Sequence, residues 1–210
     1  MRITHLLILA VALISVACAD PAANKPKATV SNAAPETNSN KPAGAETLTI
    51  SPDNSKVDFV AAKITRSHNG SFKKFSGTID LVNNKPEESR VSIDIEANSV
   101  ETDEPDLTKH LQTPDFFDVA KFPKATFVST KIEPANTGGV THNIIGNFEL
   151  HGIKKAISFP ATIQIANDKV TVNAEFSINR KDWGLTYPGK ADDLIRDGVV
   201  IRLNVSAPRK

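Results

Sequence analysis

Residues that could carry out chemistry are few in this sequence, and their spacing favours binding over catalysis. No two of the histidines His68, His110, His142 and His151 have metal-ligand spacing, and no carboxylate cluster completes a metal site. No G-x-S-x-G motif presents a serine nucleophile, and the one cysteine, Cys18, falls in an export signal. We therefore expect a protein that is not an enzyme and that needs neither a metal nor a cofactor.

Cationic side chains occur near a Gly- and Pro-containing segment, residues 184–191 (GLTYPGKA). This segment nearly matches a phosphate-binding P-loop, but Ala191 lacks the hydroxyl that would bind magnesium and no strand-to-helix context surrounds it. Arg suits bidentate contacts to oxyanions, so Arg180 and Arg196 are candidate contacts for a pyrophosphate or quinone headgroup. The alternative is that Arg180, Lys181 and Arg196 are solvated surface residues.

The overall charge gives no reason to expect a nucleic-acid partner. The chain has 25 Lys and Arg residues against 24 Asp and Glu, a formal net charge of +1. Nucleic-acid binding usually requires a clustered basic face. A hydrophobic content of 40% indicates a globular protein.

The first 17 residues have the features of a bacterial export signal. Arg2 precedes an apolar run from Leu6 to Ala17, which is too short to cross a bilayer as a mature helix. The run ends in Ser15-Val16-Ala17-Cys18, which resembles the lipobox of bacterial lipoproteins, although Ser15 stands where Leu is usual. We expect Cys18 to be the lipidated first residue of the mature protein, in the periplasm or at the outer membrane. The alternative is an ordinary secretory signal.

Residues 18–46 predict a disordered tether between this anchor and a folded domain over residues 47–210. The segment is rich in Ala, Asn, Pro and Lys, has no aromatic residue, and contains Val30 as its only large aliphatic one. Such a composition cannot bury enough apolar area to offset the entropy of ordering. As a flexible coil it would span roughly 30 Å.

From residue 47 onward, alternating apolar and polar residues predict an all-β domain. One short helix is expected within 103–112, capped by Asp103, with Pro105 in its first turn. Alternation of period two indicates strands of an antiparallel sheet with one wet face. The alternating segments are 57–61, 75–81, 91–97, 125–127, 144–150, 157–165, 170–178 and 199–205.

Eight strands of this kind favour closure into a barrel, which removes exposed sheet edges. An eight-stranded barrel can be filled by side chains or can hold one small ligand. Large residues alternate with small ones on the inward faces, as in Phe59 with Ala61 and Phe148 with Gly146. This pattern fits either jigsaw packing or an apolar lumen.

Several motifs resemble the YceI-like lipid/polyisoprenoid-binding family, over essentially residues 47–205. They are His110-Leu111, Asp115-Phe116-Phe117-Asp118, Phe122-Pro123-x-x-x-Phe127, Gly146-Asn147-Phe148-x-Leu150-x-Gly152 and Arg180-x-x-Trp183-Gly184-Leu185. The resemblance implies an extended, lipocalin-like, eight-stranded antiparallel barrel with one short helix between strands. It also implies that the Asp-Phe-Phe-Asp segment lies near the entrance of an apolar cavity. Trp183 stands where Phe is more usual.

The cavity residues expected on this basis come from the inward faces, the Phe pair and the loop after 178. In an extended segment Phe116 and Phe117 would point in opposite directions, one to the barrel wall and one to the lumen. Trp183 could be a lid or a plug of the barrel end, and we favour the plug. The expected lining is Val57, Phe59, Phe75, Ile79, Ile93, Phe116, Phe117, Phe127, Phe148, Phe159, Ile163, Phe176, Ile178 and Trp183.

The resulting hypothesis is a carrier of lipids in the bacterial cell envelope. Its ligand would be a polyisoprenoid, an isoprenoid quinone or a similar amphiphile, and its contact with the membrane would be the N-terminal lipid anchor. A homodimer is a further expectation. One alternative is a protein-interaction module with a filled core. Another is an enzyme acting on a lipid held in the cavity, which would require a polar residue inside.

Overall fold

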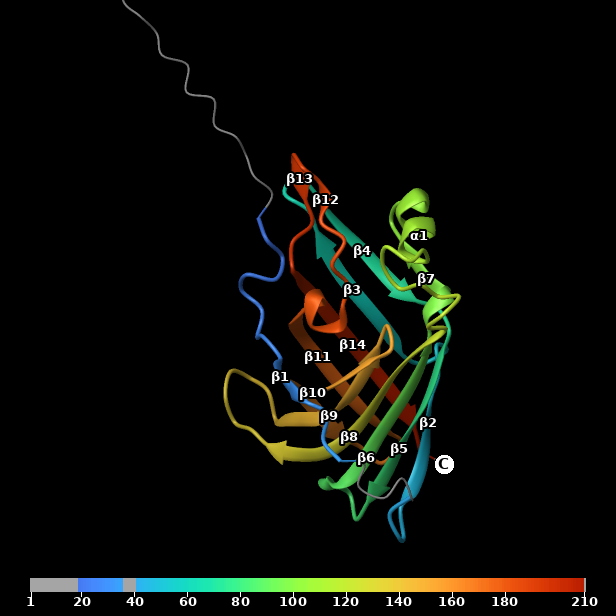
Figure 1. The fold of residues 1–210 in the computed structure, drawn as a ribbon. Helices are drawn as coiled ribbons and strands as arrows, with labels where there is room; N and C mark the ends of the chain where they lie inside the picture. Colours follow the sequence, from blue (N-terminus) through green and yellow to red (C-terminus); the bar gives the residue numbers. More distant parts are fainter. Residues whose placement is uncertain (1–18, 36–40, 210) are drawn as a thin grey trace, which may run out of the picture.

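The computed structural model describes residues 19–35 and 41–209. Its strands wrap around a common axis, with one short helix at one end (Figure 1). The bounds of the elements are β1 (Thr29–Asn32), β2 (Glu46–Ile50), β3 (Lys56–Ala62), β4 (Ser67–Phe72), β5 (Phe75–Val82), β6 (Lys85–Glu96), η1 (Ala97–Ser99), β7 (Val100–Thr102), α1 (Pro105–Leu111), β8 (Lys124–Pro134), β9 (His142–Leu150), β10 (Ile153–Ile165), β11 (Lys169–Asn179), η2 (Arg180–Trp183), β12 (Gly189–Lys190), β13 (Asp193–Leu194) and β14 (Gly198–Pro208).

These elements form the expected all-β barrel of eight long antiparallel strands within the described residues. Three of the eight are interrupted: β2 continues as β3, β4 as β5, and β6 as β7 through the turn η1. The order of pairing is β2-β5-β6-β8-β9-β10-β11-β14-β3-β4-β7. Because β14 pairs with β3, and β3 is the continuation of β2, the order returns to its starting strand. Closure of this kind leaves few free edges.

The alternation in the sequence agrees with the observed strands. Each of the eight alternating segments lies largely within one observed strand, and β8 alternates buried and accessible residues along most of its length. The inward positions form one large apolar core. The fold class is therefore confirmed, and its physical basis is the period-two pattern.

The short helix α1 begins later than expected. Its N-cap is Glu104, whose side chain makes no capping hydrogen bond, with Pro105 in the first turn. Asp103 instead accepts hydrogen bonds from the Asn69 N–H and the His68 ring on β4. The expected Asp103 cap is therefore wrong, because that carboxylate joins the helix start to the barrel wall. In the described part of the chain no helix has the length and apolar character needed to cross a bilayer.

Part of the segment 18–46, for which we expect disorder, is paired with the barrel in the structure. Strand β1 pairs antiparallel with β10 over Thr29–Asn32, and Ala28 is buried in the main core. Backbone hydrogen bonds need no apolar side chains, so a polar segment can join a sheet wherever a strand edge is free. Residues 1–18 and 36–40 lie outside the described residues, and with them the predicted signal and Cys18.

Candidate functional site: an apolar cavity inside the barrel

An apolar cavity of about 170 Å³ lies inside the barrel. Its walls come from most of the long strands, and Leu111, Phe116 and Phe117 close the end that carries α1. Arg180 is the one lining residue with a polar side chain, among the residues that the structure describes. Such a cavity excludes water and favours an apolar guest.

Glycines opposite aromatic rings help to keep this space open. A Cβ at Gly70 would lie 2.1 Å from Cζ of Phe59, and one at Gly146 would lie 2.5 Å from Cζ of Phe127. Each ring therefore lies flat against the barrel wall over a residue without a side chain. The sequence left open whether small residues beside large ones indicate jigsaw packing or an apolar lumen. In the structure they do both, since they pack against the rings locally and leave a lumen in the middle.

The structure brings ten of the fourteen expected lining residues together around this cavity. All ten come from the inward faces of strands or from the Phe pair. They are Val57, Phe59, Ile93, Phe116, Phe117, Phe127, Phe148, Phe159, Phe176 and Ile178.

The other four expected residues lie outside this lining: Phe75, Ile79, Ile163 and Trp183. Ile79 faces Leu48 across the β2–β5 ladder, in the end of the barrel that side chains fill. Phe75 is likewise buried in the core, and Ile163 is half-buried near the end of β10. Alternation gives the face of a strand but not the depth along the barrel axis, which decides whether a residue fills the core or lines the cavity.

Trp183 is buried beside the cavity, and its expected role as a plug of the barrel end stays a prediction. It is 0% exposed in η2, its ring packs edge-on to Phe148 with centroids 5.3 Å apart, and its Nε1–H donates to the Phe148 carbonyl at 3.3 Å. Phe148 itself lines the cavity. Trp183 therefore stands directly behind the cavity wall.

The mouth of the cavity, beside α1, is closed by aromatic side chains. The His110 ring lies 5.0 Å from Phe116 and 5.1 Å from Tyr187, and its Nε2 lies 2.8 Å from Asp115 Oδ2. The ring of Phe117 packs against that of Phe72, with their centroids 5.7 Å apart. Both members of the Phe pair line the cavity, so the expectation of opposite directions is wrong. The reason is that residues 112–122 form successive turns rather than an extended segment.

Arg180 holds the loop that follows η2. Its guanidinium is 4% exposed and donates to the carbonyls of Leu185, Ile195 and Arg196, the last at 3.1 Å. Burial lowers the pKa of Arg180, and Asp197, 3.6 Å away, partly offsets this effect. The N–H donors of Arg180, which we expected to bind a headgroup, thus bind backbone carbonyls instead. The Arg196 side chain lies outside the cavity lining, 3.8 Å from Asp20, so its headgroup role stays a prediction.

Sequence reasoning missed further lining residues. Most lie on the same inward faces, where the alternation could have identified them, but Leu111, Leu185 and Ile195 come from the helix and loops and carry no such signal. The full set of missed residues is Ala61, Phe72, Val91, Ile95, Leu111, Ala125, Ile144, Leu150, Ile157, Val172, Leu185, Ile195, Val199, Ile201, Leu203 and Val205.

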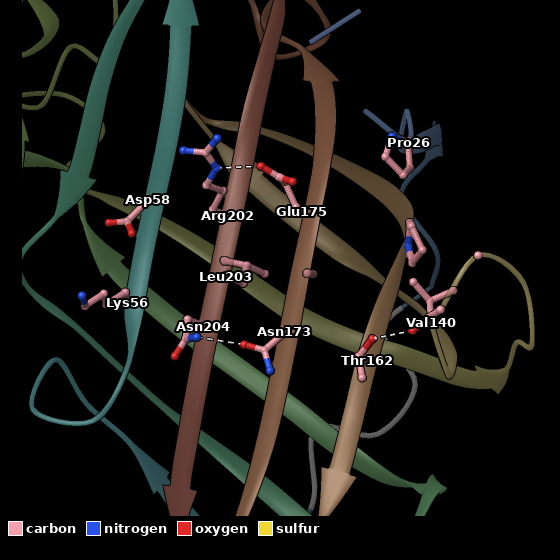
Figure 2. Close-up of a pocket in the computed structure, with 14 residues that line it drawn as sticks. Pro26, Lys56, Asp58, Val140, Thr162, Asn173, Glu175, Arg202, Leu203 and Asn204 are labelled. Atoms are coloured by element: carbon pink, nitrogen blue, oxygen red, sulfur yellow. Dashed lines mark hydrogen bonds and ion pairs between the residues drawn. The ribbon is translucent and has the colours of Figure 1, made fainter. Parts of the chain in front are cut away.

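A second hollow lies on the outer face of β3, β14, β11 and β10 and has the opposite character (Figure 2). It is larger, about 640 Å³, and open to solvent. Arg202 Nε donates to Glu175 Oε1 at 2.7 Å, and Asn204 Nδ2 donates to Asn173 Oδ1 at 2.9 Å. Because the hollow is open to solvent and lined by these polar groups, it offers an apolar chain no dry surface.

The other histidines among the described residues lie apart from one another. His68 contacts Asp103 at 2.8 Å, His142 contacts Glu87 at 3.2 Å, and His151 Nδ1 lies 3.3 Å from the Trp183 carbonyl. The described residues contain no group of three or more His, Cys, Asp or Glu that could hold a metal ion.

A family model described as YceI-like domain matches residues 48–207 of the chain. A UPF0312 protein of Pseudomonas putida (strain W619) is 34% identical over 126 residues, which cover 57% of this chain and 65% of that protein. The alignment thus spans slightly less than two thirds of that relative's length. A UPF0312 protein of Pseudomonas syringae pv. tomato is 33% identical over 140 residues, covering 63% and 72% of the two chains.

Solved structures share the barrel. BcnA of Burkholderia cenocepacia has a TM-score of 0.68 at 25% identity, covering 75% of this chain and 99% of that one. The YceI protein of Campylobacter jejuni has a TM-score of 0.55 at 25% identity, covering 67% and 84%. A polyisoprenoid-binding domain of Saccharophagus degradans has a TM-score of 0.61 at 17% identity, covering 79% and 99%, a likeness of fold alone.

Proposed function

The chain belongs to the YceI-like family, and from this premise we propose that it binds the apolar tail of a polyisoprenoid, isoprenoid quinone or similar lipid inside its barrel. The observation that carries the proposal is the lining of the cavity, which is apolar apart from Arg180. Moving such a tail from water into a dry cavity contributes about 0.8 kcal/mol for each buried CH₂. Affinity then needs no hydrogen bond, and specificity follows the shape of the cavity and its mouth.

The size of the cavity limits what it holds without rearrangement. A dry cavity of about 150 Å³ accommodates a guest the size of benzene. At about 170 Å³, this one holds the end of a tail rather than a complete polyprenyl chain. A longer tail requires movement of side chains, and Phe117 at the mouth is half-buried and attached to a segment of turns.

Two further parts of the proposal concern place and role. The N-terminal sequence supports export to the periplasm or outer membrane, with Cys18 as a lipid anchor to the membrane. Membership of the YceI-like family and the apolar cavity support a role in lipid binding rather than catalysis, and a domain named for polyisoprenoid binding in Saccharophagus degradans shares the fold. We favour storage or transport of the lipid over an interaction module with a filled core, because the barrel contains a cavity.

Two variants that change the volume of the cavity in opposite directions test it as the binding site. Ala125→Phe places a ring in the cavity, whereas Ile93→Ala enlarges it; both positions line it. Titration with a quinone that carries two isoprene units, followed through the fluorescence of Trp183, measures the affinity. We expect binding to be lost in Ala125→Phe and retained or strengthened in Ile93→Ala for a longer tail.

Both variants lose stability, since overpacking and cavity formation are each unfavourable. General damage would therefore weaken binding in both. Equal affinities in the wild type and Ala125→Phe would contradict a binding site inside the barrel, provided that circular dichroism shows both proteins folded.

A further inference from the structure

The barrel wall forks between β10 and β11. These strands pair from Thr162 opposite Asn173 to Ile165 opposite Val170, and both strands are described along their whole length. Continued in the same register, the ladder would place Ser158 opposite Ser177. No such pair exists among the described residues, because both serines pair with another segment.

That segment is the N-terminal one, which lies in the fork as an inserted strand (Figure 1). On one side, Thr29 faces Ser158 in the antiparallel ladder between β1 and β10. On the other side, the Ala28 N–H donates to the Ser177 carbonyl and the Ser177 N–H donates to the Pro26 carbonyl, each at 2.8 Å. Residues 26–32 therefore complete the wall where two strands of the barrel separate.

The apolar cavity lies directly behind this inserted strand. Phe159 on β10 and Phe176 on β11 would be opposite each other in the continued register, and their rings stack with centroids 4.2 Å apart and planes 12° apart. Both rings line the cavity, as do Ile157 and Ile178 on the same two strands. The layers at the fork, from outside to inside, are thus β1, the stacked rings and the cavity.

Few side chains hold the inserted strand. Ala28, 4% exposed, is its one fully buried apolar residue, and Val30 is half-buried against the core. Polar contacts secure the flanks: Lys25 Nζ lies 2.7 Å from Glu175 Oε2, and Asn147 exchanges two hydrogen bonds of 2.9 Å with the Ala34 backbone. The Lys25–Glu175 pair is partly exposed and therefore weak, whereas Asn147 is buried and holds the end of the segment at Ala34. Between these flanks the strand is held mainly by backbone hydrogen bonds, which can open locally.

We propose that the fork between β10 and β11 is the portal of the cavity and that residues 26–32 are its shutter. Displacing this segment uncovers the stacked Phe159 and Phe176, whose side chains then separate to admit an apolar tail. The segment reseats by backbone pairing once the tail is inside. This inference rests on the proposed lipid-binding function and assigns the route by which the ligand reaches the site.

A reversible disulfide across the shutter tests the proposal. Thr29→Cys with Ser158→Cys joins register partners of β1 and β10 in the full-length chain, in which Cys18→Ser removes the native thiol. The matched control, Asn173→Cys with Asn204→Cys, joins partners of β11 and β14 and leaves β1 free. Mass measurement verifies each disulfide, and stopped-flow quenching of Trp183 by the two-isoprene quinone gives the rate of uptake.

With the disulfide of the shutter pair oxidised, we expect uptake of the quinone to be at least about tenfold slower than in the wild type, as for a locked lid. Reduction of the disulfide should restore the rate of uptake. The oxidised control should behave as the wild type. Ala28→Asp, which places a carboxylate in a buried position, should unseat the segment and accelerate uptake, whereas Ser31→Asp, at an exposed position, should not.

Uptake at the wild-type rate by the oxidised shutter pair would overturn the portal and assign entry to the mouth beside α1. Failure of the proposed function has a different signature. In that case the reduced pair and the wild type would both fail to bind the quinone at equilibrium, whatever the state of the disulfide.

Discussion

The barrel has two closures that differ in how they are held, the mouth beside α1 and the fork between β10 and β11. Buried side chains hold the mouth: Leu111 and Phe116 are buried there, and Arg180 donates to three carbonyls of the loop that carries Tyr187. Backbone pairing of a polar segment holds the fork, with Ala28 as its one buried apolar residue. Removing a buried side chain costs more than opening exposed hydrogen bonds.

The difference indicates that the mouth contributes to global stability, whereas the fork opens locally. The pairing of β11 with its two neighbouring strands supports this difference. On the β14 side, β11 pairs without interruption from Lys169 to Asn179, while on the β10 side it pairs only from Val170 to Asn173. A seam that is interrupted in this way gives the wall a defined place to open.

The largest effect is expected at Trp183, which is completely buried behind the cavity wall. Trp183→Ala removes a fully buried ring and its hydrogen bond to the Phe148 carbonyl, and it should lower the free energy of unfolding by about 3–5 kcal/mol. Urea unfolding followed by circular dichroism measures this change. A loss below about 1 kcal/mol would mean that this buried ring contributes no more to stability than an exposed side chain does.

A smaller global loss is expected from Arg180→Met. The substitution keeps much of the side-chain volume but leaves the buried carbonyls of Leu185 and Ile195 without their donor, at a cost of about 1–3 kcal/mol. Arg180→Lys should recover only part of it, because an ammonium group cannot reproduce the planar fork. If Arg180→Met had the same free energy of unfolding in urea as the wild type, Arg180 would not contribute to holding the mouth.

At the fork we expect the segment to open locally while the rest of the protein stays folded. In native-state hydrogen exchange, the amides of Ala28 and Ser177 should exchange about tenfold faster or more than amides in the middle of the β11–β14 ladder. The two amides should also share one opening free energy, since they hydrogen-bond across the same seam. Protection equal to that of the β11–β14 ladder would make the fork as firm as the rest of the wall.

The smallest effect concerns pH. Hydrogen bonds from Lys25 and then Arg202 lower the pKa of Glu175 below its ordinary value of 4.5. A carboxyl group with a depressed folded pKa stabilises the fold above its unfolded pKa, and this contribution is lost as the pH falls through the folded value. Acidification below about pH 4.5 should therefore loosen the N-terminal segment, as followed by the NMR signal of the Ala28 amide.

Glu175→Gln is the matched control for this titration, since it retains the shape of the side chain without its charge. The Ala28 signal of that variant should lose the Glu175 component of the pH dependence. The same midpoint in both proteins would assign the effect to another group.

The sequence predicted the barrel because alternation identifies each strand and its inward face. It predicted lining residues such as Phe127 and Phe176 for the same reason. It could not separate Ile79, which fills the core, from Ile93, which lines the cavity, because depth along the axis depends on the register between strands. It also missed strand β1, since pairing in the fork relies on backbone groups and on a gap made by β10 and β11.

The most direct test of the central claim, that the barrel is a hollow apolar site for a lipid tail, is the content of the protein itself. Protein produced in a bacterial envelope and purified without added lipid is extracted with organic solvent, and the extract is analysed by mass spectrometry. We expect an apolar-tailed lipid in stoichiometric amount in the wild type, and less of it in Ala125→Phe. Protein that is consistently empty, and stays empty after incubation with isoprenoid quinone, would contradict it.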